Sequence, residues 1–265
     1  MDRAHVPDRS LAAWILGTLP CLLWVLFIGA LMRVGLGLWF PRLSAPYWLD
    51  AAVALLGLAL TLAPLSRQLP LQNILAATLI LFCLERAPVS PGKLAGLDLQ
   101  LNPGVQKAFP WIYPAACAAV ILSARGLARL LLRPTLPRYP LSFVGLVVLL
   151  STLFALGFEP FATHIRGYYN WPPLRAAGQW FGVPWYGFLA HAAVSALGLL
   201  AATPFLISKR PAPIKDSFQP VAVWILLNLL CLSGAIADRL WPAACVILVG
   251  NLLLPALALG TRRQR

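Results

Sequence analysis

Residues 139–159 read YPLSFVGLVVLLSTLFALGFE, and no charged side chain interrupts this run before its last residue, Glu159. A helix rises about 1.5 Å per residue, so about 20 such residues cross the roughly 30 Å hydrocarbon core of a bilayer. Similar runs recur along the chain, in which 60% of the 265 residues are hydrophobic and 11% are charged. A soluble domain of this composition would expose too much apolar surface. We therefore predict an all-α, polytopic integral membrane helical bundle.

The apolar runs predict a single membrane domain over residues 1–265 with about eight transmembrane helices. The second and third runs are separated only by residues 67–70, so we expect them to form a hairpin. The first run resembles a signal peptide, but it is long and no small-residue cleavage pattern follows it. We expect it to be a retained helix. The predicted spans are approximately 11–32, 48–66, 69–85, 110–131, 139–159, 181–207, 218–237 and 241–260.

Most basic residues lie in the connections between these spans. Of 21 Lys and Arg residues, 13 lie on the side of the termini and the even-numbered loops, if Arg125 and Arg129 near the end of the fourth span are counted with the loop that follows, and eight lie in the odd-numbered loops. The positive-inside rule then places both termini in the cytoplasm, in a multi-pass protein of the inner (cytoplasmic) membrane. The net charge of +13 is scattered, and Arg125, Arg129, Arg133 and Arg138 suit an anionic lipid surface. We expect membrane lipids as partners and no nucleic acid.

The five cysteines all lie inside predicted spans, and no two have the spacing of metal ligands. We interpret them as small buried hydrophobic residues, and we expect neither a disulfide framework nor a metal site. These cysteines are Cys21, Cys83, Cys117, Cys231 and Cys245.

Most of the acidic residues gather on the side opposite to the predicted cytoplasmic face, and four of them end or begin spans. The positive-inside bias alone can place acids there, and so can pairing with Arg86, Arg166 or Arg239. We favour these interpretations for two of the acids. An ionisable group that reaches into hydrocarbon is costly and is a functional candidate, which favours a role for Glu159 and Glu85. The acids on this side are Asp50, Glu85, Asp98, Glu159 and Asp238, of which Asp98 and Asp238 are the two without an expected function.

Aromatic rings follow Glu159 in the stretch FEPFATHIRGYYNWPPLRAAGQWFGVPWYG, residues 158–187. Burial among rings favours the neutral carboxyl, which can donate a proton as a general acid. Aromatic faces also stabilise a nearby cation, so the stretch suits chemistry through a carbocation. An aromatic belt at the membrane interface would produce the same composition. We expect His164 to lie near the headgroups. For His191 we favour a structural role, a hydrogen bond to a neighbouring helix, over a catalytic or metal-binding role.

Three short motifs in this region carry a resemblance to a known family. An acid-Pro pair, Glu159-Pro160, closes a span; GYYNW at 167–171 follows it; and WFGVP at 180–184 leads into the next span. Together they resemble the membrane carotenoid-biosynthesis family that includes the bisanhydrobacterioruberin and γ-carotene hydratases. Glu85, which ends a span before a Gly-containing loop, matches an earlier feature of that family. The resemblance covers roughly residues 80–200.

The sequence departs from the family pattern at three places. The Gly, Phe and Tyr content of the family's first motif is low in residues 86–109 of this chain. The family usually has Asp where Glu159 stands. After the Val-Pro pair it usually has Asn and then Gly-Trp, where this chain has Gly187 and Ala190-His191.

The resemblance implies a cofactor-independent carotenoid 1,2-hydratase, a hydro-lyase that adds water to the terminal C=C of an acyclic end group and forms a tertiary alcohol. A polyene about as long as the bilayer core is thick would bring its end to the membrane surface, where water and acids are available. Other enzymes of carotenoid biosynthesis are further candidate partners. The alternatives are a non-enzymatic carotenoid- or lipid-binding membrane protein and a small-solute transporter, although transporters more often carry polar groups near the midplane.

The predicted site follows from the same resemblance and from the positions of the acids. Glu159 is the expected proton donor, with Glu85 or Asp50 orienting the water, and no cofactor or metal is expected. The expected substrate-binding residues are Tyr168, Tyr169, Trp171, Trp180, Phe181, Trp185 and His191.

Overall fold

The structure is a computed structural model of the 265-residue chain. It describes residues 11–87, 89–90, 93–94, 97–98, 100–105, 109–132, 140–172, 178–207 and 217–260. Within these ranges, side chains are described except at 11–17, 89–98, 109–111 and 140. Asp98, which was expected to have no function, and Arg133 and Arg138, which were expected at a lipid surface, therefore lie outside the described side chains.

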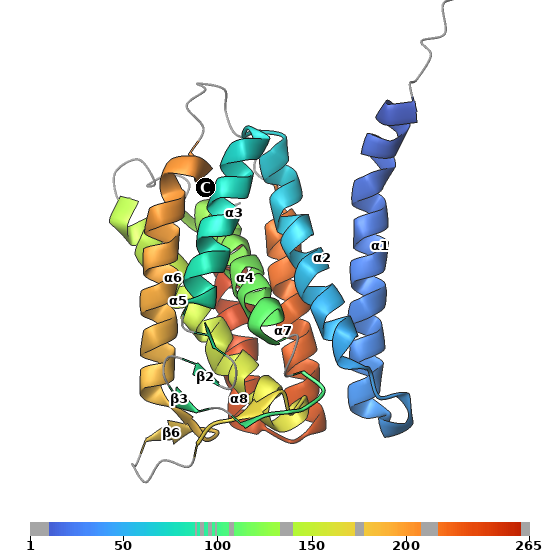
Figure 1. The fold of residues 1–265 in the computed structure, drawn as a ribbon, viewed down its shortest axis with the longest axis vertical. Helices are drawn as coiled ribbons and strands as arrows, with labels where there is room; N and C mark the ends of the chain where they lie inside the picture. Colours follow the sequence, from blue (N-terminus) through green and yellow to red (C-terminus); the bar gives the residue numbers. More distant parts are fainter. Residues whose placement is uncertain are drawn as a thin grey trace, which may run out of the picture.

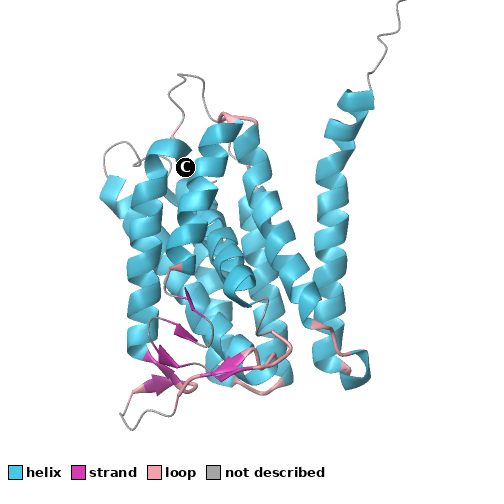
Figure 2. Ribbon diagram, in the orientation of Figure 1, coloured by secondary structure: helices cyan, strands magenta, loops and turns pink. Residues whose placement is uncertain are grey.

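The described chain is a bundle of helices, with short strands at one end (Figures 1 and 2). Seven helical segments are long and apolar enough to cross a membrane, and α3 is a shorter helix of 16 residues. The prediction of an all-α polytopic bundle is confirmed. Its helical segments are α1 (Leu11–Trp39), α2 (Tyr47–Ser66), α3 (Leu71–Arg86), α4 (Phe109–Leu132), α5 (Pro140–Pro160) continued by the π-helical η2 (Phe161–Ile165), α6 (Trp185–Leu206), α7 (Gln219–Ala237), and a last rod of α8 (Trp241–Cys245), the π-helical η3 (Val246–Leu253) and α9 (Leu254–Gly260).

Three helix ends differ clearly from the predicted bounds. The fifth span was predicted to end at residue 159, but its helix continues through Pro160 and η2 to Ile165. The first helix continues to Trp39 instead of ending near residue 32. Arg33 does not stop it, because its guanidinium hydrogen-bonds two carbonyls beyond the helix. These belong to Leu43, the last residue of the turn η1 (Pro41–Leu43), and to Ser44, which follows it. The sixth span begins at residue 185 rather than 181. The preceding residues form a hairpin of β6 (Gln179–Trp180) and β7 (Val183–Pro184).

The central helix is α4, which packs against α2, α3, α5 and α7 (Figure 1). Its buried face is rich in alanine, and small side chains let neighbouring helices approach closely. A similar approach occurs where Gly157 of α5 meets Ile247 of η3, since a Cβ on Gly157 would lie 2.4 Å from Ile247 Cγ1. Helix α1 lies on the outside of the bundle against α2 and α7.

Two long connections meet at one end of the bundle. In the first, β1 (Val89–Ser90), β2 (Lys93–Leu94) and β3 (Leu97–Asp98) form an antiparallel sheet, followed by β4 (Gln100–Leu101). In the second, β5 (Tyr169–Asn170) pairs antiparallel with β4, so that Leu101 lies opposite Tyr169. The pairing of β4 with β5 joins the α3–α4 connection to the α5–α6 connection. The start of α1 and the end of α9 lie at the opposite end of the bundle (Figure 1).

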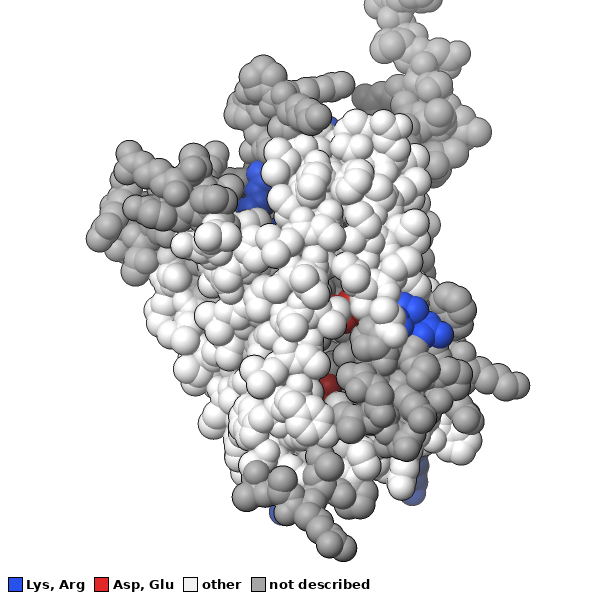
Figure 3. All heavy atoms as spheres, turned by 60° about the vertical axis from the view of Figure 1, so that its left-hand side comes forward, with Lys and Arg blue, Asp and Glu red and all other residues white. Residues whose placement is uncertain are grey.

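The outer surface is mostly uncharged. Many large apolar side chains are exposed, among them Val25, Leu71 and Leu189. Among the described residues on the face shown in Figure 3, the basic atoms lie towards the margins, and acidic atoms appear at two recessed points. This distribution matches a surface in contact with lipid. Arg125, which the sequence placed at a lipid surface, is instead buried, and its guanidinium donates to the carbonyl of Leu206 at 2.9 Å.

Candidate functional site

Glu159 lies one turn before the end of a helical rod, because the helix continues through Pro160 into η2. Thr163 Oγ1 donates to the Glu159 carbonyl at 2.8 Å within this extension. The side chain is 7% exposed. Tyr169 Oη donates to Glu159 Oε2 at 2.9 Å, and Trp171 Nε1 donates to the same oxygen at 3.2 Å. Both hydrogen bonds end on Oε2, which leaves Oε1 as the oxygen that can carry a proton.

The backbone that follows η2 places Tyr169 against this carboxyl. Gly167 has a φ of +58°, a conformation that glycine adopts readily, and the chain reverses there. The Tyr168 amide then donates to the Ala162 carbonyl at 2.8 Å, and β5 pairs with β4. Tyr169 is buried, and burial, followed by the neighbouring Glu159 carboxyl, raises its pKa well above the ordinary value. Its phenol therefore stays protonated and acts as a hydrogen-bond donor.

Glu159 lines a cavity of about 110 Å³ that is bounded by residues of α2, α4, α5 and α7. Since one water needs about 10–15 Å³ on such a measure, the cavity has room for several waters or for the end of an apolar chain. Most of the lining is apolar, and no Lys or Arg is among the described residues that form it. Its aromatic residues are Tyr47, Tyr113, Phe154, Phe158, Phe161 and Tyr168, and its other polar side chains are Asp50, Cys117 and His191.

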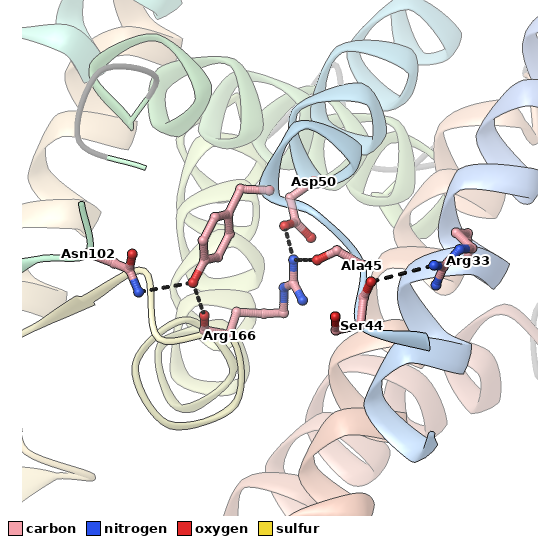
Figure 4. A network of polar contacts seen from close by, with 7 residues as sticks. Arg33, Ser44, Ala45, Asp50, Asn102 and Arg166 are labelled. Carbon is pink, nitrogen blue, oxygen red and sulfur yellow. Dashed lines mark hydrogen bonds and ion pairs between the residues drawn. The ribbon is translucent and has the colours of Figure 1, made fainter. Parts of the chain in front are cut away.

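Asp50 lines the same cavity, and its carboxyl is paired with Arg166 (Figure 4). The same guanidinium nitrogen donates to the Ala45 carbonyl at 2.9 Å. Tyr47 Oη donates to the Arg166 carbonyl at 3.3 Å and accepts from Asn102 Nδ2 at 3.0 Å. The Asp50 and Arg166 side chains are only 10% and 9% exposed. This network ties the start of α2 to the end of η2 beside the cavity.

The pairing also determines the charge of the arginine. Burial by itself lowers the pKa of Arg166, but the charge of Asp50 and the hydrogen bond to it have the opposite effect, and the pKa is raised overall. Arg166 therefore remains a cation beside Asp50. The sequence had suggested such a pairing as the alternative to a catalytic role for the acids on this side.

Glu85, the other predicted acid, is 2% exposed and is not among the residues that line the cavity. Its carboxyl oxygen, Cys117 Sγ and a ring nitrogen of His191 all lie within 4.8 Å of one another. Glu85 thus belongs to a cluster whose other two members, Cys117 and His191, line the cavity, but Glu85 itself does not line it beside Glu159.

The predicted aromatic residues divide into three groups. Tyr168 and His191 line the cavity, whereas Tyr169 and Trp171 bind Glu159. The other three lie elsewhere, which corrects their predicted place in the pocket. Trp180 donates to the Leu156 carbonyl at 2.8 Å and packs beside Val183 and Phe188, Phe181 occupies the β6–β7 turn with a φ of +50°, and Trp185 is 47% exposed.

The β6–β7 hairpin also contacts His164, which was expected near the headgroups and lies in η2. His164 Nε2 lies 3.2 Å from the Phe181 carbonyl oxygen, and the two rings meet edge to face.

Sequence reasoning missed the cavity residues contributed by other helices, chiefly Tyr47, Tyr113 and Phe154. For two of them, the spacing to another cavity residue in the sequence could have indicated a shared helix face. Tyr47 stands three residues before Asp50, and Tyr113 stands four before Cys117, so each pair shares a helix face. Nothing in the linear sequence shows that these two faces and the end of α5 meet.

Comparisons with known proteins yield no relative of this chain: no protein-family model, no curated protein and no solved structure matches it. The functional evidence therefore comes from the residues and geometry of its own site.

Proposed function

We propose that this chain is a membrane carotenoid hydratase that adds water to the terminal C=C of an acyclic polyene end group by acid catalysis. The supporting observation is the Glu159 carboxyl in an apolar, ring-lined cavity, with two donors on one oxygen and the other oxygen left to carry a proton. No Lys or Arg is among the described residues of the lining, which favours the neutral carboxyl. A neutral carboxylic acid is the form that can protonate an alkene.

The proposed reaction begins when Glu159 transfers its proton to the less substituted carbon of the terminal double bond. The other carbon becomes a tertiary carbocation, which the faces of rings such as Tyr168 and Phe158 stabilise. Tyr169 and Trp171 stabilise the new carboxylate through Oε2. A water oxygen then forms a bond to the cation, and the proton that this water loses returns to Glu159. The products are a tertiary alcohol and the regenerated acid.

Water would enter the proposed site near Asp50, which is the second carboxyl of the cavity lining. Its charge is paired with Arg166, so it can accept a hydrogen bond from water without competing with Glu159 for the proton. Glu85 has no part in this proposal, because it does not line the cavity. The reaction needs no nucleotide, flavin or haem.

The proposed location is the inner membrane, with both termini in the cytoplasm and the site at the opposite face. The excess of Lys and Arg on the side of the termini supports this orientation. A fluorescent protein that folds only in the cytoplasm should be fluorescent when fused to either terminus. Fluorescence from a fusion at one terminus alone would contradict the proposed topology.

Expression in bacteria that accumulate lycopene or γ-carotene tests the function. We expect new, more polar pigments that are heavier by the mass of one water for each modified end. Pigment that purifies with the protein in unaltered form would favour the non-enzymatic binding protein. Unchanged pigments together with no bound pigment would reject the carotenoid proposal.

A further inference from the structure

Three metal-ligating side chains meet inside the bundle, outside the machinery proposed for hydration. Glu85 is in the last turn of α3, Cys117 is on α4 and His191 is on α6. One ligand atom from each lies within 4.8 Å of the other two. Glu85 and Cys117 are buried, and His191 is partly buried with its Nε2 atom enclosed.

Several polar atoms at this place lack a hydrogen-bond partner among the described residues. Glu85 Oε1 and His191 Nε2 are both buried without a hydrogen bond of ordinary geometry, and so is Ser195 Oγ, one turn further along α6 from His191, although the Glu85 carboxyl interacts with the Cys117 and Ser195 side chains. Glu85 is 2% exposed and Ser195 is 1% exposed. Each buried polar group without a partner costs about 1–3 kcal/mol, and native proteins contain few of them. Such a concentration points to a ligand that satisfies these atoms together.

The donor types indicate which ligand this is. Carboxylate, thiolate and imidazole are the ligands that Zn²⁺ takes in proteins, whereas Ca²⁺ and Mg²⁺ select oxygen. Zinc–ligand bonds of about 2.0–2.3 Å place tetrahedral ligand atoms roughly 3.3–3.8 Å apart. The three ligand atoms, which lie within 4.8 Å of one another, need only a small movement of the side chains to reach that spacing.

Charge balance favours the same ion. An ionised carboxylate and an ionised thiolate carry two negative charges, and a neutral imidazole adds none, so one Zn²⁺ makes the cluster electrically neutral. Neutrality matters because unpaired charge is costly at membrane depth.

We propose that Glu85, Cys117 and His191 bind one Zn²⁺ ion, which links α3, α4 and α6. Water or Ser195 completes the tetrahedral coordination. This inference does not depend on the hydratase activity, because it rests on ligand chemistry and not on the cavity's substrate.

The test is zinc and cobalt binding by the full-length chain, purified in detergent, stripped with a chelator and titrated with each metal alone. Wild type should bind about one equivalent of Zn²⁺, and its Co²⁺ form should show thiolate-to-cobalt charge-transfer absorption. Cys117→Ser should abolish that absorption and weaken zinc binding by more than about 100-fold. Substitutions of residues that only hydrogen-bond to metal ligands already lower metal affinity by about 10–100-fold, and the loss of a ligand should cost more. Cys231→Ser is the matched control, because Cys231 is also buried and lines the same cavity but is not in the cluster.

Three results would overturn the site. These are a wild-type chain that binds no zinc, a cobalt form without thiolate absorption, and equal zinc affinity in the Cys117 and Cys231 variants. If Cys117→Ser does not fold, His191→Gln replaces it, with the same expected loss of affinity. Zinc should also raise the melting temperature of wild type and of Cys231→Ser.

Discussion

Replacing Tyr169 by Phe tests how the proposed proton donor is controlled. The substitution keeps the buried ring and removes the hydroxyl that donates to Glu159 Oε2 at 2.9 Å. Trp171 still donates to the same oxygen, so the carboxyl keeps one of its two hydrogen bonds. The change therefore removes one interaction from the reacting group without opening a large cavity.

The expected magnitude follows from the change in charge during proton transfer. A hydrogen bond to a neutral group contributes about 0.5–1.5 kcal/mol, and one to a charged group contributes about 1.5–3 kcal/mol. Tyr169 therefore stabilises the carboxylate formed in the reaction by about 1–1.5 kcal/mol more than it stabilises the neutral acid. Since 1.36 kcal/mol corresponds to a tenfold change in rate, Tyr169→Phe should slow hydration by about 5–13-fold.

The assay is the initial rate of alcohol formation in membranes supplied with an acyclic carotenoid, normalised to folded protein. Tyr186→Phe is the control, because Tyr186 is 44% exposed and is not among the cavity residues; its rate should equal that of wild type. An unchanged rate in Tyr169→Phe would refute the proposed stabilisation of Glu159. A higher rate would do so as well, because it would mean that the hydroxyl favours the neutral acid.

Two further predictions concern stability. Asp50→Asn should destabilise the protein by about 3–5 kcal/mol, because it leaves the largely buried Arg166 without its counter-charge, and adding Arg166→Gln should recover part of the loss. Additive losses in thermal unfolding would show that the pair is not coupled. Gly157→Ala should cost about 1–3 kcal/mol, since the new Cβ would lie 2.4 Å from Ile247 Cγ1, and Ile247→Ala should partly restore stability. Gly145→Ala, which has open space around it, should show no loss in the same melting experiment.

The helices were predictable from sequence because hydrocarbon thickness sets a minimum run of apolar residues, which composition reveals directly. The bounds of α2, α4 and α7 fall within two residues of the predicted spans. The end of α1 was missed because a single arginine was taken as a boundary, whereas its long side chain can reach carbonyl groups beyond the helix. Hairpin β6–β7 was missed because residues 179–184 are as apolar as the helix they precede.

The site was only partly predictable, because its residues come from several helices. The importance of Glu159 and its neighbouring rings could be inferred, since they are close in sequence and an acid in an apolar run is unusual. The Glu85–Cys117–His191 cluster had no sequence signal, because its members are on three helices and lack the regular spacing of metal motifs. Only helix packing determines which faces meet, and the apolar pattern of a membrane helix carries little information about its orientation.

The most direct test of the proposed function is the pigment content of a lycopene- or γ-carotene-producing bacterium that expresses wild type or Glu159→Gln. Glutamine keeps the shape of the side chain, and its carbonyl oxygen can still accept from Tyr169 and Trp171, but it cannot act as the acid. We predict hydrated pigment with wild type and, because general acids typically contribute about 10²–10⁴-fold, a loss of that order with Glu159→Gln at equal amounts of folded protein. Equal yields of hydrated pigment from the two proteins would contradict the proposed role of Glu159.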